Sequence, residues 1–292
     1  MTNKKNNASL GDYRFALPQY IIPHHFISRI TLGVTRIKIK WLKNAIIKWV
    51  IKRYKVNLAE AVDEDINNYQ HFNEFFTRPL KASVRPIASG DNLLCCPVDG
   101  AVSQVGDIKD DTIYQAKGHD YSAKTLLGGY SDIADQFSQG KFATLYLSPR
   151  DYHRIHMPVT GTLKHMVYVP GRLFSVNPQT ARVIPNVFAR NERVIAIFDT
   201  EFGAMALVLV GALNVACIET VWQGVVTPPH KQPIHRWVYD QEQDIVLNKG
   251  DEMGRFNMGS TVICLFENAA LNFDSAFKEA APIIMGQAFL SL

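Results

Sequence analysis

A glycine and a serine at positions 259 and 260 form a peptide bond that the chain could cut by itself. Glycine leaves the carbonyl of this bond unhindered and the backbone mobile, so the Ser260 hydroxyl can turn back and attack it. The sequence Met258-Gly259-Ser260-Thr261 also precedes an apolar run, which is typical of an ordinary turn that leads into a strand. The cleavage hypothesis therefore requires an activating base and an orienting acid elsewhere in the sequence.

Two histidines, His153 and His156, stand three residues apart in a segment that also contains Arg150, Asp151 and Arg154. Histidine titrates near neutral pH without a large perturbation, which favours general acid or base chemistry. The spacing places both rings on one side only if the segment is helical. We expect no metal here, because no third ligand stands at convincing spacing and the arginines disfavour a cation. Structural, hydrogen-bonded histidines remain the alternative.

Asp99 lies in Pro97-Val98-Asp99-Gly100, between an apolar run and a glycine turn. By itself this pattern is typical of a turn aspartate. A catalytic serine, however, needs a histidine, and that histidine needs a carboxylate to fix its tautomer and stabilise its charged form. Asp99, His156 and Ser260 can supply such a set.

A further polar cluster combines Arg190 and Asn191 with Phe174 and Ser175 upstream. Arginine and amide groups of this kind can hold a phosphate or a carboxylate, which makes the four residues candidates for substrate binding. A solvated loop is the alternative interpretation.

The elements that position these residues change in kind along the chain. Helices are expected through Tyr54, over residues 66–76 and over residues 131–139. From Leu93 onward, short runs rich in Val, Ile and Leu alternate with Gly, Pro, Asn and Asp, which predicts strands. We therefore expect an α+β protein in which N-terminal, membrane-facing amphipathic helices precede a β-rich, sandwich- or barrel-like catalytic body. The expected parts are a polar mobile start (1–12), a basic helical region (13–80) and the β-rich domain (81–292).

Composition excludes several protein classes. With 292 residues, 47% of them hydrophobic, the chain can bury a substantial core. Its four cysteines lack the spacing of a zinc site or a disulfide framework, so reduced thiols are expected. The polar start predicts no signal peptide, and the most apolar stretch, residues 204–218, is interrupted by Gly211 and Asn214 and predicts strands rather than a membrane span.

Basic charge is concentrated near the N-terminus, where residues 13–59 include ten Lys or Arg and no Asp or Glu. Between Trp41 and Val50 apolar residues recur at helical spacing, with lysines largely on the other sides. Such a cationic amphipathic helix suits the surface of an anionic membrane, and residues 20–32 could add a second, shorter helix of this kind. Packing of the apolar stripe on the protein's own core is an alternative. Nucleic acid is not an expected partner, since no recognisable motif for it is present.

Several ordered blocks of the sequence resemble one family. They are Phe72-Asn73-Glu74-Phe75-Phe76-Thr77-Arg78-Pro79-Leu80, Pro97-Val98-Asp99-Gly100, Gln115-Ala116-Lys117-Gly118-His119, the 146–158 segment, Phe188-Ala189-Arg190-Asn191-Glu192-Arg193, Glu252-Met253-Gly254-Arg255-Phe256 and Gly259-Ser260-Thr261. With these blocks the chain resembles the pyruvoyl-dependent phosphatidylserine decarboxylases of the bacterial membrane-associated type. One departure is Met258, where the family usually has Leu. Because Met is apolar and of similar volume, we expect cleavage to survive.

The resemblance implies that self-cleavage uses a charge-relay set, and the family's three residues correspond to Asp99, His156 and Ser260 in this sequence. His156 would deprotonate Ser260, whose oxygen attacks the Gly259 carbonyl to give an ester. Elimination and hydrolysis would then leave a pyruvoyl group derived from Ser260. The products would be a β chain of residues 1–259 and an α chain of residues 260–292.

The resemblance also implies the reaction that follows. Phosphatidylserine would form a Schiff base with the pyruvoyl group and lose CO2, and phosphatidylethanolamine would be released. We assign the return of a proton to His153, although the family resemblance does not by itself divide the work of the two histidines. The expected location is the cytoplasmic side of the cell membrane, peripherally bound through anionic lipid, and a homodimer of αβ units is a further expectation.

Two other functions compete with this one. A serine hydrolase could use Ser260, His156 and Asp99 on an external ester, although the Gly-x-Ser-x-Gly elbow is missing. A non-catalytic membrane-binding module would use the amphipathic helix alone, and would leave the downstream blocks without a purpose.

Overall fold

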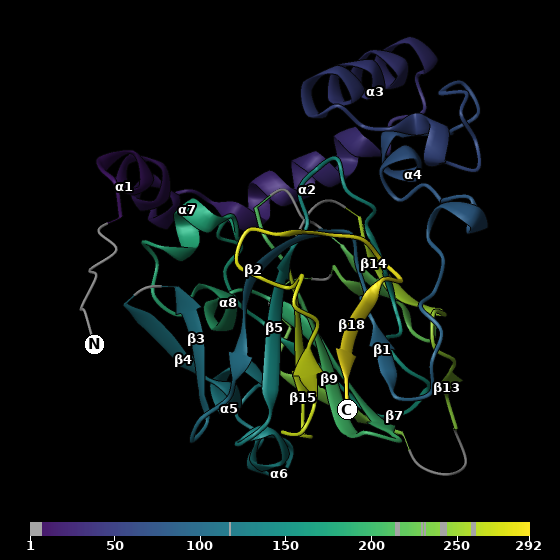
Figure 1. Ribbon diagram of the computed structural model, residues 1–292. Helices are drawn as coiled ribbons and strands as arrows, with labels where there is room; N and C mark the ends of the chain where they lie inside the picture. The colour runs from purple at the N-terminus through teal and green to yellow at the C-terminus, as the bar shows by residue number, and fades with distance from the viewer. Residues whose placement is uncertain are drawn as a thin grey trace.

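The computed structural model of the protein describes residues 8–116, 118–213, 217–228, 230, 232–239, 244–257 and 261–292. Helices at the N-terminal end lie across one end of a body built from several sheets (Figure 1). The predicted α+β class, with helices followed by a β-rich body, is confirmed. The sheets in the described residues form no closed barrel.

The N-terminal region contains four α-helices and three short 3-10 helices among its described residues. They are α1 (Leu10–Ala16), η1 (Leu17–Tyr20), α2 (His24–Thr35), α3 (Lys40–Tyr54), η2 (Leu58–Glu60), α4 (Phe72–Phe76) and η3 (Ala82–Val84). Helix α1 begins within the segment expected to be a polar start, because Ser9 and Asp12 cap it reciprocally. Residues 1–7 of that start lie outside the described residues.

The helix expected over residues 66–76 is shorter than predicted, since α4 begins only at Phe72. The His71 Nδ1 atom accepts the Glu74 backbone N–H at 3.0 Å and so caps the helix at its first turn. Before it, the side chain of Asp65 accepts the backbone N–H of Asn67, which favours a turn over a helix.

In the described part of the chain, nine antiparallel strands form the main sheet. Its order is β12 (His235–Val238), β7 (Gly161–Val169), β8 (Arg193–Thr200), β9 (Gly203–Val210), β15 (Thr261–Phe266), β5 (Lys141–Tyr146), β2 (Gly100–Asp107) and β17 (Pro282–Ile283), and β13 (Val246–Leu247) also pairs with β7. Strand β15 is buried at all six positions and pairs with β5 and β9. The residues from Thr261 to Phe266, which come after Ser260, therefore form a central strand of the sheet.

Three smaller sheets and several short helices complete the body as far as its residues are described. The sheets are β1 (Leu93–Cys95) with β18 (Ala288–Ser291) and β16 (Asn272–Phe273); β11 (Gly224–Thr227) with β10 (Ile218–Thr220), β14 (Glu252–Phe256) and β6 (Arg154–His156); and β3 (Thr112–Ala116) with β4 (His119–Ser122). The helices are α5 (Ala123–Leu126), α6 (Ser131–Ala134), η4 (Asp135–Phe137), α7 (Pro178–Ala181) and α8 (Val187–Arg190). The helix expected over residues 131–139 is thus present as α6 and η4. All four cysteines are buried free thiols.

Helix α3 packs one side on the protein and exposes another. Ile47 and Val50 are buried in a cluster with Phe72, Phe75 and Phe76 of α4. Trp41 and Trp49, which the sequence placed on the same apolar side, are 72% and 60% exposed. The two alternatives for this helix, self-packing and an exposed apolar surface, therefore apply to different residues of one helix. No helix in the described part of the chain combines the length and apolar character that crossing a bilayer requires.

Lys43 departs from the pattern expected of the helix's lysines, because it is only 3% exposed. Its ammonium group donates to the backbone carbonyls of Ile66, Asn67 and Tyr69, at 2.9, 3.3 and 2.6 Å. It therefore fixes the segment before α4 rather than facing a membrane.

Replacing Lys43 with methionine is expected to lower the free energy of unfolding by about 2–3 kcal/mol, because three buried carbonyls lose a charged donor. Thermal or denaturant unfolding measures the change. Lys48→Met on the same helix is the matched control, since Lys48 is exposed, and should change stability by less than about 0.5 kcal/mol. Equal losses from both variants would contradict a structural role for Lys43.

Candidate active site

His153 lies just before β6 and is fully buried, with its ring 4.1 Å from the ring of Phe76. Its Nδ1 atom is 2.7 Å from the carbonyl oxygen of Asp151, which can only accept, so the proton is on Nδ1. The Nε2 atom therefore carries the lone pair, and it is buried without a hydrogen-bond partner among the described residues. Burial lowers the pKa of His153 to about 3, so the ring is neutral at physiological pH.

His156 occupies the end of β6, so the segment is extended rather than helical and the two rings do not share a helical face. Its Nδ1 atom donates to the carbonyl of Gly250 at 2.8 Å, and the Tyr152 hydroxyl donates to Nε2 at 3.1 Å. The Tyr152 ring also stacks on the imidazole. Burial lowers the pKa of His156, and the bond to Gly250 offsets part of that effect. Both histidines are thus held as neutral rings with the lone pair on Nε2.

Asp99 is buried, and its carboxylate is fully occupied. The Arg85 guanidinium donates to it from Nε at 2.9 and 3.1 Å and from Nη2 at 2.6 Å, while the backbone N–H of Met285 donates to Oδ1 at 2.8 Å. Among the described residues its partners thus do not include His156. The next residue, Gly100, has φ 151°, and a Cβ there would lie 2.2 Å from the Tyr146 carbonyl oxygen, so only glycine allows this approach.

Gly259 and Ser260, the predicted cleavage site, lie outside the described residues, as does Met258. The structure describes the chain up to Asn257 before this site and from Thr261 after it. The Phe256 backbone N–H donates to the carbonyl of His153 at 3.0 Å, and Thr261 begins β15. The backbone N–H of His156 donates to the carbonyl of Pro97 at 2.9 Å. The structure therefore brings together the segments that carry Asp99, the two histidines and the approach to Ser260.

The block from Phe72 to Leu80 supplies contacts that the sequence did not assign. The Asn73 side chain donates to the Asn257 side-chain oxygen at 2.7 Å, and the Asn257 amide in turn contacts the Cys217 sulfur at 2.8 Å. The Phe76 ring packs against His153. Helix α4 therefore contacts both the histidine segment and the segment that precedes the predicted cleavage bond. Arg85 is a second missed residue. The local sequence around Arg85 contains no pattern that predicts its contact with Asp99.

The four predicted substrate-binding residues lie together beside η1. The Asn191 amide donates to the carbonyls of Phe174 and Gly211, both at 2.8 Å, and accepts the Phe174 N–H at 3.0 Å. The Arg190 guanidinium lies over the rings of Tyr20 and Phe174, at 5.3 Å from each. The Ser175 backbone N–H donates to the side chain of Gln19 at 2.8 Å. Asn191 thus has a structural role, while Arg190 lines an open pocket of about 820 Å³.

The low pKa of His153 predicts a pH dependence of stability. The pKa is about 3 in the folded protein against an ordinary value of 6.5, so between these limits the unfolded chain binds more protons. Stability should be complete above pH 6.5 and fall as the pH drops, by about 1.4 kcal/mol per pH unit from this residue. Denaturant unfolding at several pH values measures the slope. A slope in His153→Gln as steep as in the wild type would contradict the assignment.

Comparison with known proteins gives a family. A family model described as phosphatidylserine decarboxylase matches residues 72–291, and a second, described as PSD, matches residues 14–55. Relatives named phosphatidylserine decarboxylase proenzyme occur in Vibrio cholerae, 54% identical over 93% of this chain and 96% of the relative, and in Vibrio parahaemolyticus, 53% identical over 92% and 95%. A third, from Pseudomonas putida, is 52% identical over 94% of this chain and 96% of the relative. Matches of this extent and identity mean that the chain belongs to the phosphatidylserine decarboxylase family.

Proposed function

We propose that the chain cuts itself between Gly259 and Ser260 and then converts phosphatidylserine to phosphatidylethanolamine and CO2 at the site formed around His153 and His156. The observation that carries the proposal is the convergence of three distant segments, those of Asp99, of the two histidines and of Asn257: the His156 backbone N–H donates to the Pro97 carbonyl, and the Phe256 backbone N–H donates to the His153 carbonyl. The family's name and the proenzyme names of the relatives agree with it.

In the first step the Ser260 hydroxyl is the nucleophile and the Gly259 carbonyl is the electrophile. A neutral imidazole must take the hydroxyl proton, and both histidines carry a lone pair on Nε2. We assign this role to His156, with Asp99 as the acid of the set. In the structure Asp99 binds Arg85, and His156 binds Tyr152. The Asp99 carboxylate therefore acts on the His156 ring through its charge alone, or the two residues first give up these hydrogen bonds and bind each other.

The second step would use a pyruvoyl group left at position 260, which supplies an electron sink for the departing carboxylate. The surroundings suit a small polar group, because His153 Nε2 and Thr261 Oγ1 are both buried without a hydrogen-bond partner among the described residues. His153 is the proposed carrier of the proton that replaces CO2: its neutral ring first takes a proton from water on Nε2 and then passes it to the α carbon of the substrate. A ring buried this deeply holds a proton weakly once it has received one, which favours rapid transfer to the substrate.

Intact mass under denaturing conditions tests the proposal. An active preparation should give two chains, of residues 1–259 and 260–292, and the smaller should have a blocked N-terminus. A single species of 32.9 kDa with decarboxylase activity would exclude self-cleavage as the source of activity. A serine hydrolase or a membrane-binding module would leave the chain uncut, so the measurement separates the proposed function from both alternatives.

The N-terminal helices support membrane docking, because α2 exposes its apolar side and buries its polar one. Phe26, Ile30 and Val34, spaced four residues apart, are 63%, 52% and 42% exposed. His24 and Ser28, by contrast, are 2% and 0% exposed. Water would favour the opposite arrangement, and a lipid interface favours this one. We propose that the protein binds peripherally to the cytoplasmic side of the cell membrane through α1, α2 and α3, as αβ units that pair into a homodimer.

Replacing Trp41 and Trp49 with alanine is expected to weaken vesicle binding about tenfold or more, at low and at high salt, because the loss is apolar. Lys48→Met should weaken binding at low salt only, since salt screens its attraction to anionic headgroups. Sedimentation with phosphatidylserine-containing vesicles measures both effects. Val246→Ser, at an exposed position on β13, is the control. Undiminished binding by the double tryptophan variant would exclude this surface.

A further inference from the structure

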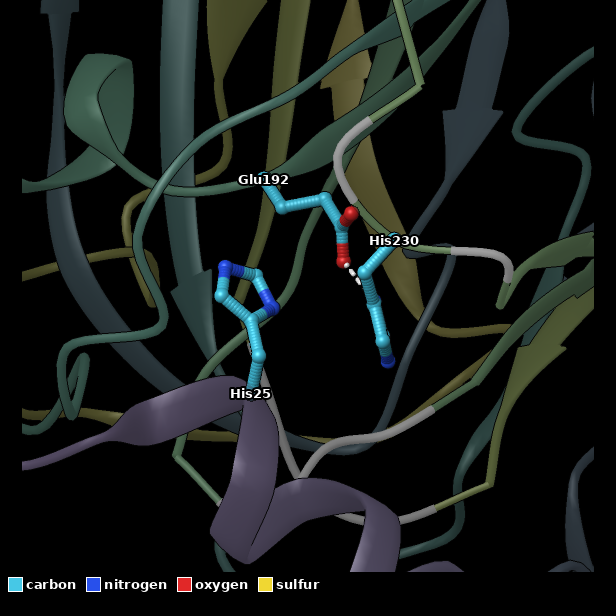
Figure 2. Close-up of side chains that lie close together, drawn as sticks. All are labelled: His25, Glu192 and His230. Atoms are coloured by element: carbon cyan, nitrogen blue, oxygen red, sulfur yellow. Dashed lines mark hydrogen bonds and ion pairs between the residues drawn. The ribbon is translucent and has the colours of Figure 1, made fainter.

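Three side chains that the proposed reaction does not use meet beside α2 (Figure 2). His25 extends from α2, Glu192 directly precedes β8, and His230 lies between β11 and β12. One ligand atom of each lies within 4.8 Å of those of the other two. Glu192 and His230 are buried, at 1% and 6% exposure, and His25 is half-buried. Two imidazoles and a carboxylate are a common ligand set for a divalent transition metal in proteins.

The surroundings orient these groups as the outer contacts of a metal site do. The Tyr168 hydroxyl donates to Glu192 Oε1 at 2.6 Å and fixes the carboxylate, whose Oε2 lies 2.7 Å from His230 Nδ1. His25 Nε2 lies 3.0 Å from the Gly171 carbonyl, which can only accept, so the proton is on Nε2 and the lone pair on Nδ1. A backbone carbonyl that fixes the tautomer of a ligating histidine is a frequent feature of metal sites.

One member of this cluster faces an open pocket. His25 also lines the open pocket of about 820 Å³, together with Gly171, Arg172 and Arg190. The two arginines oppose a cation, and the Glu192 carboxylate offsets part of their charge. The positive charge of the arginines weakens most the binding of Mg²⁺ and Ca²⁺, because proteins bind these ions mainly through electrostatic attraction. These two ions also prefer ligand sets made of oxygen atoms only. A metal that bonds strongly to imidazole is favoured instead.

We propose that His25, Glu192 and His230 bind one Zn²⁺ ion, with a water molecule from the pocket as the remaining ligand. Binding breaks the hydrogen bond between His230 Nδ1 and Glu192 Oε2, and the proton of Nδ1 moves to Nε2, the other ring nitrogen of His230. Because His25 belongs to α2 and the other two ligands to the β-rich body, the ion ties the proposed membrane-facing helix to the body. The proposed decarboxylation does not require this zinc site.

Zinc titration of the full-length protein, after dialysis against a chelator, tests the proposal. Competition with a chromogenic zinc indicator should show one tight site per chain in the wild type. His25→Ala and His230→Ala should each weaken the affinity at least tenfold. His235→Ala is the matched control, because His235 is an exposed histidine outside the cluster, and it should bind as the wild type does. The buried thiols leave no exposed cysteine among the described residues to compete for the ion.

Two further measurements guard against a folding artefact. Substitution with Co²⁺ should give visible absorption bands in the wild type that change in His25→Gln, a variant that keeps the helix and removes the imidazole. Without metal, His25→Gln should melt at the wild-type temperature. Equal zinc affinity in the wild type and His25→Ala, or an equal loss in His235→Ala, would overturn the site whether or not the chain cuts itself.

Discussion

Ser260→Ala is expected to abolish both self-cleavage and CO2 release, leaving one uncut chain of about 32.9 kDa. Alanine has no hydroxyl to attack the Gly259 carbonyl, so no pyruvoyl group can form and the decarboxylation loses its electron sink. The loss should exceed about 10⁴-fold, because both the cleavage and every later step depend on one oxygen atom. Intact mass and release of labelled CO2 from phosphatidylserine measure the two effects together.

Ser131→Ala is a suitable control for this experiment. Ser131 is exposed at the start of α6. Helix α6 lies at the end of the body away from the N-terminal helices (Figure 1). The control should be cut and active. If Ser260→Ala were still cut at this bond, another nucleophile would have to act there. If it were uncut yet active, the electron sink would lie elsewhere.

His156→Ala and His153→Ala are expected to fail at different steps. His156→Ala should remain uncut, since the base that takes the Ser260 proton is gone. His153→Ala should be cut, yet decarboxylate about 10²–10⁴-fold more slowly, because a positioned proton donor contributes that much. The ratio of cut to uncut chain, followed over time after synthesis, separates cleavage from the later reaction.

The contacts of the two rings sharpen this comparison. Tyr152→Phe keeps the stacked ring on His156 and removes only the hydroxyl that donates to Nε2. It should therefore be cut, with a smaller change in rate than His156→Ala. The opposite result for the two alanine variants, with His153→Ala uncut and His156→Ala cut, would reverse the assignment. The buried Nε2 of His153, which has no hydrogen-bond partner in the described part of the chain, is the feature that makes such a reversal a real alternative.

Much of the fold could be predicted from local sequence. Alternating and continuous apolar runs predicted β2, β5 and β8, and Gly, Pro and Asn marked their ends, because strand periodicity and turn preferences act over a few residues. The basic and apolar pattern predicted α3 in the same way. The helix over residues 66–76 was predicted too long, since side-chain hydrogen bonds to the backbone outweighed helical periodicity before His71.

By itself the sequence determined which chemical groups are present and in which local order: a Gly-Ser bond, a pair of histidines and an aspartate beside a glycine turn. Tertiary structure alone decided what those groups contact. Asp99 binds Arg85, 14 residues away, and Met285, 186 residues away, while Lys43 is buried among carbonyls instead of facing lipid. The reason is physical: hydrogen-bond partners and burial, which set charge and proton position, arise from segments that are distant in the chain and meet only when it folds.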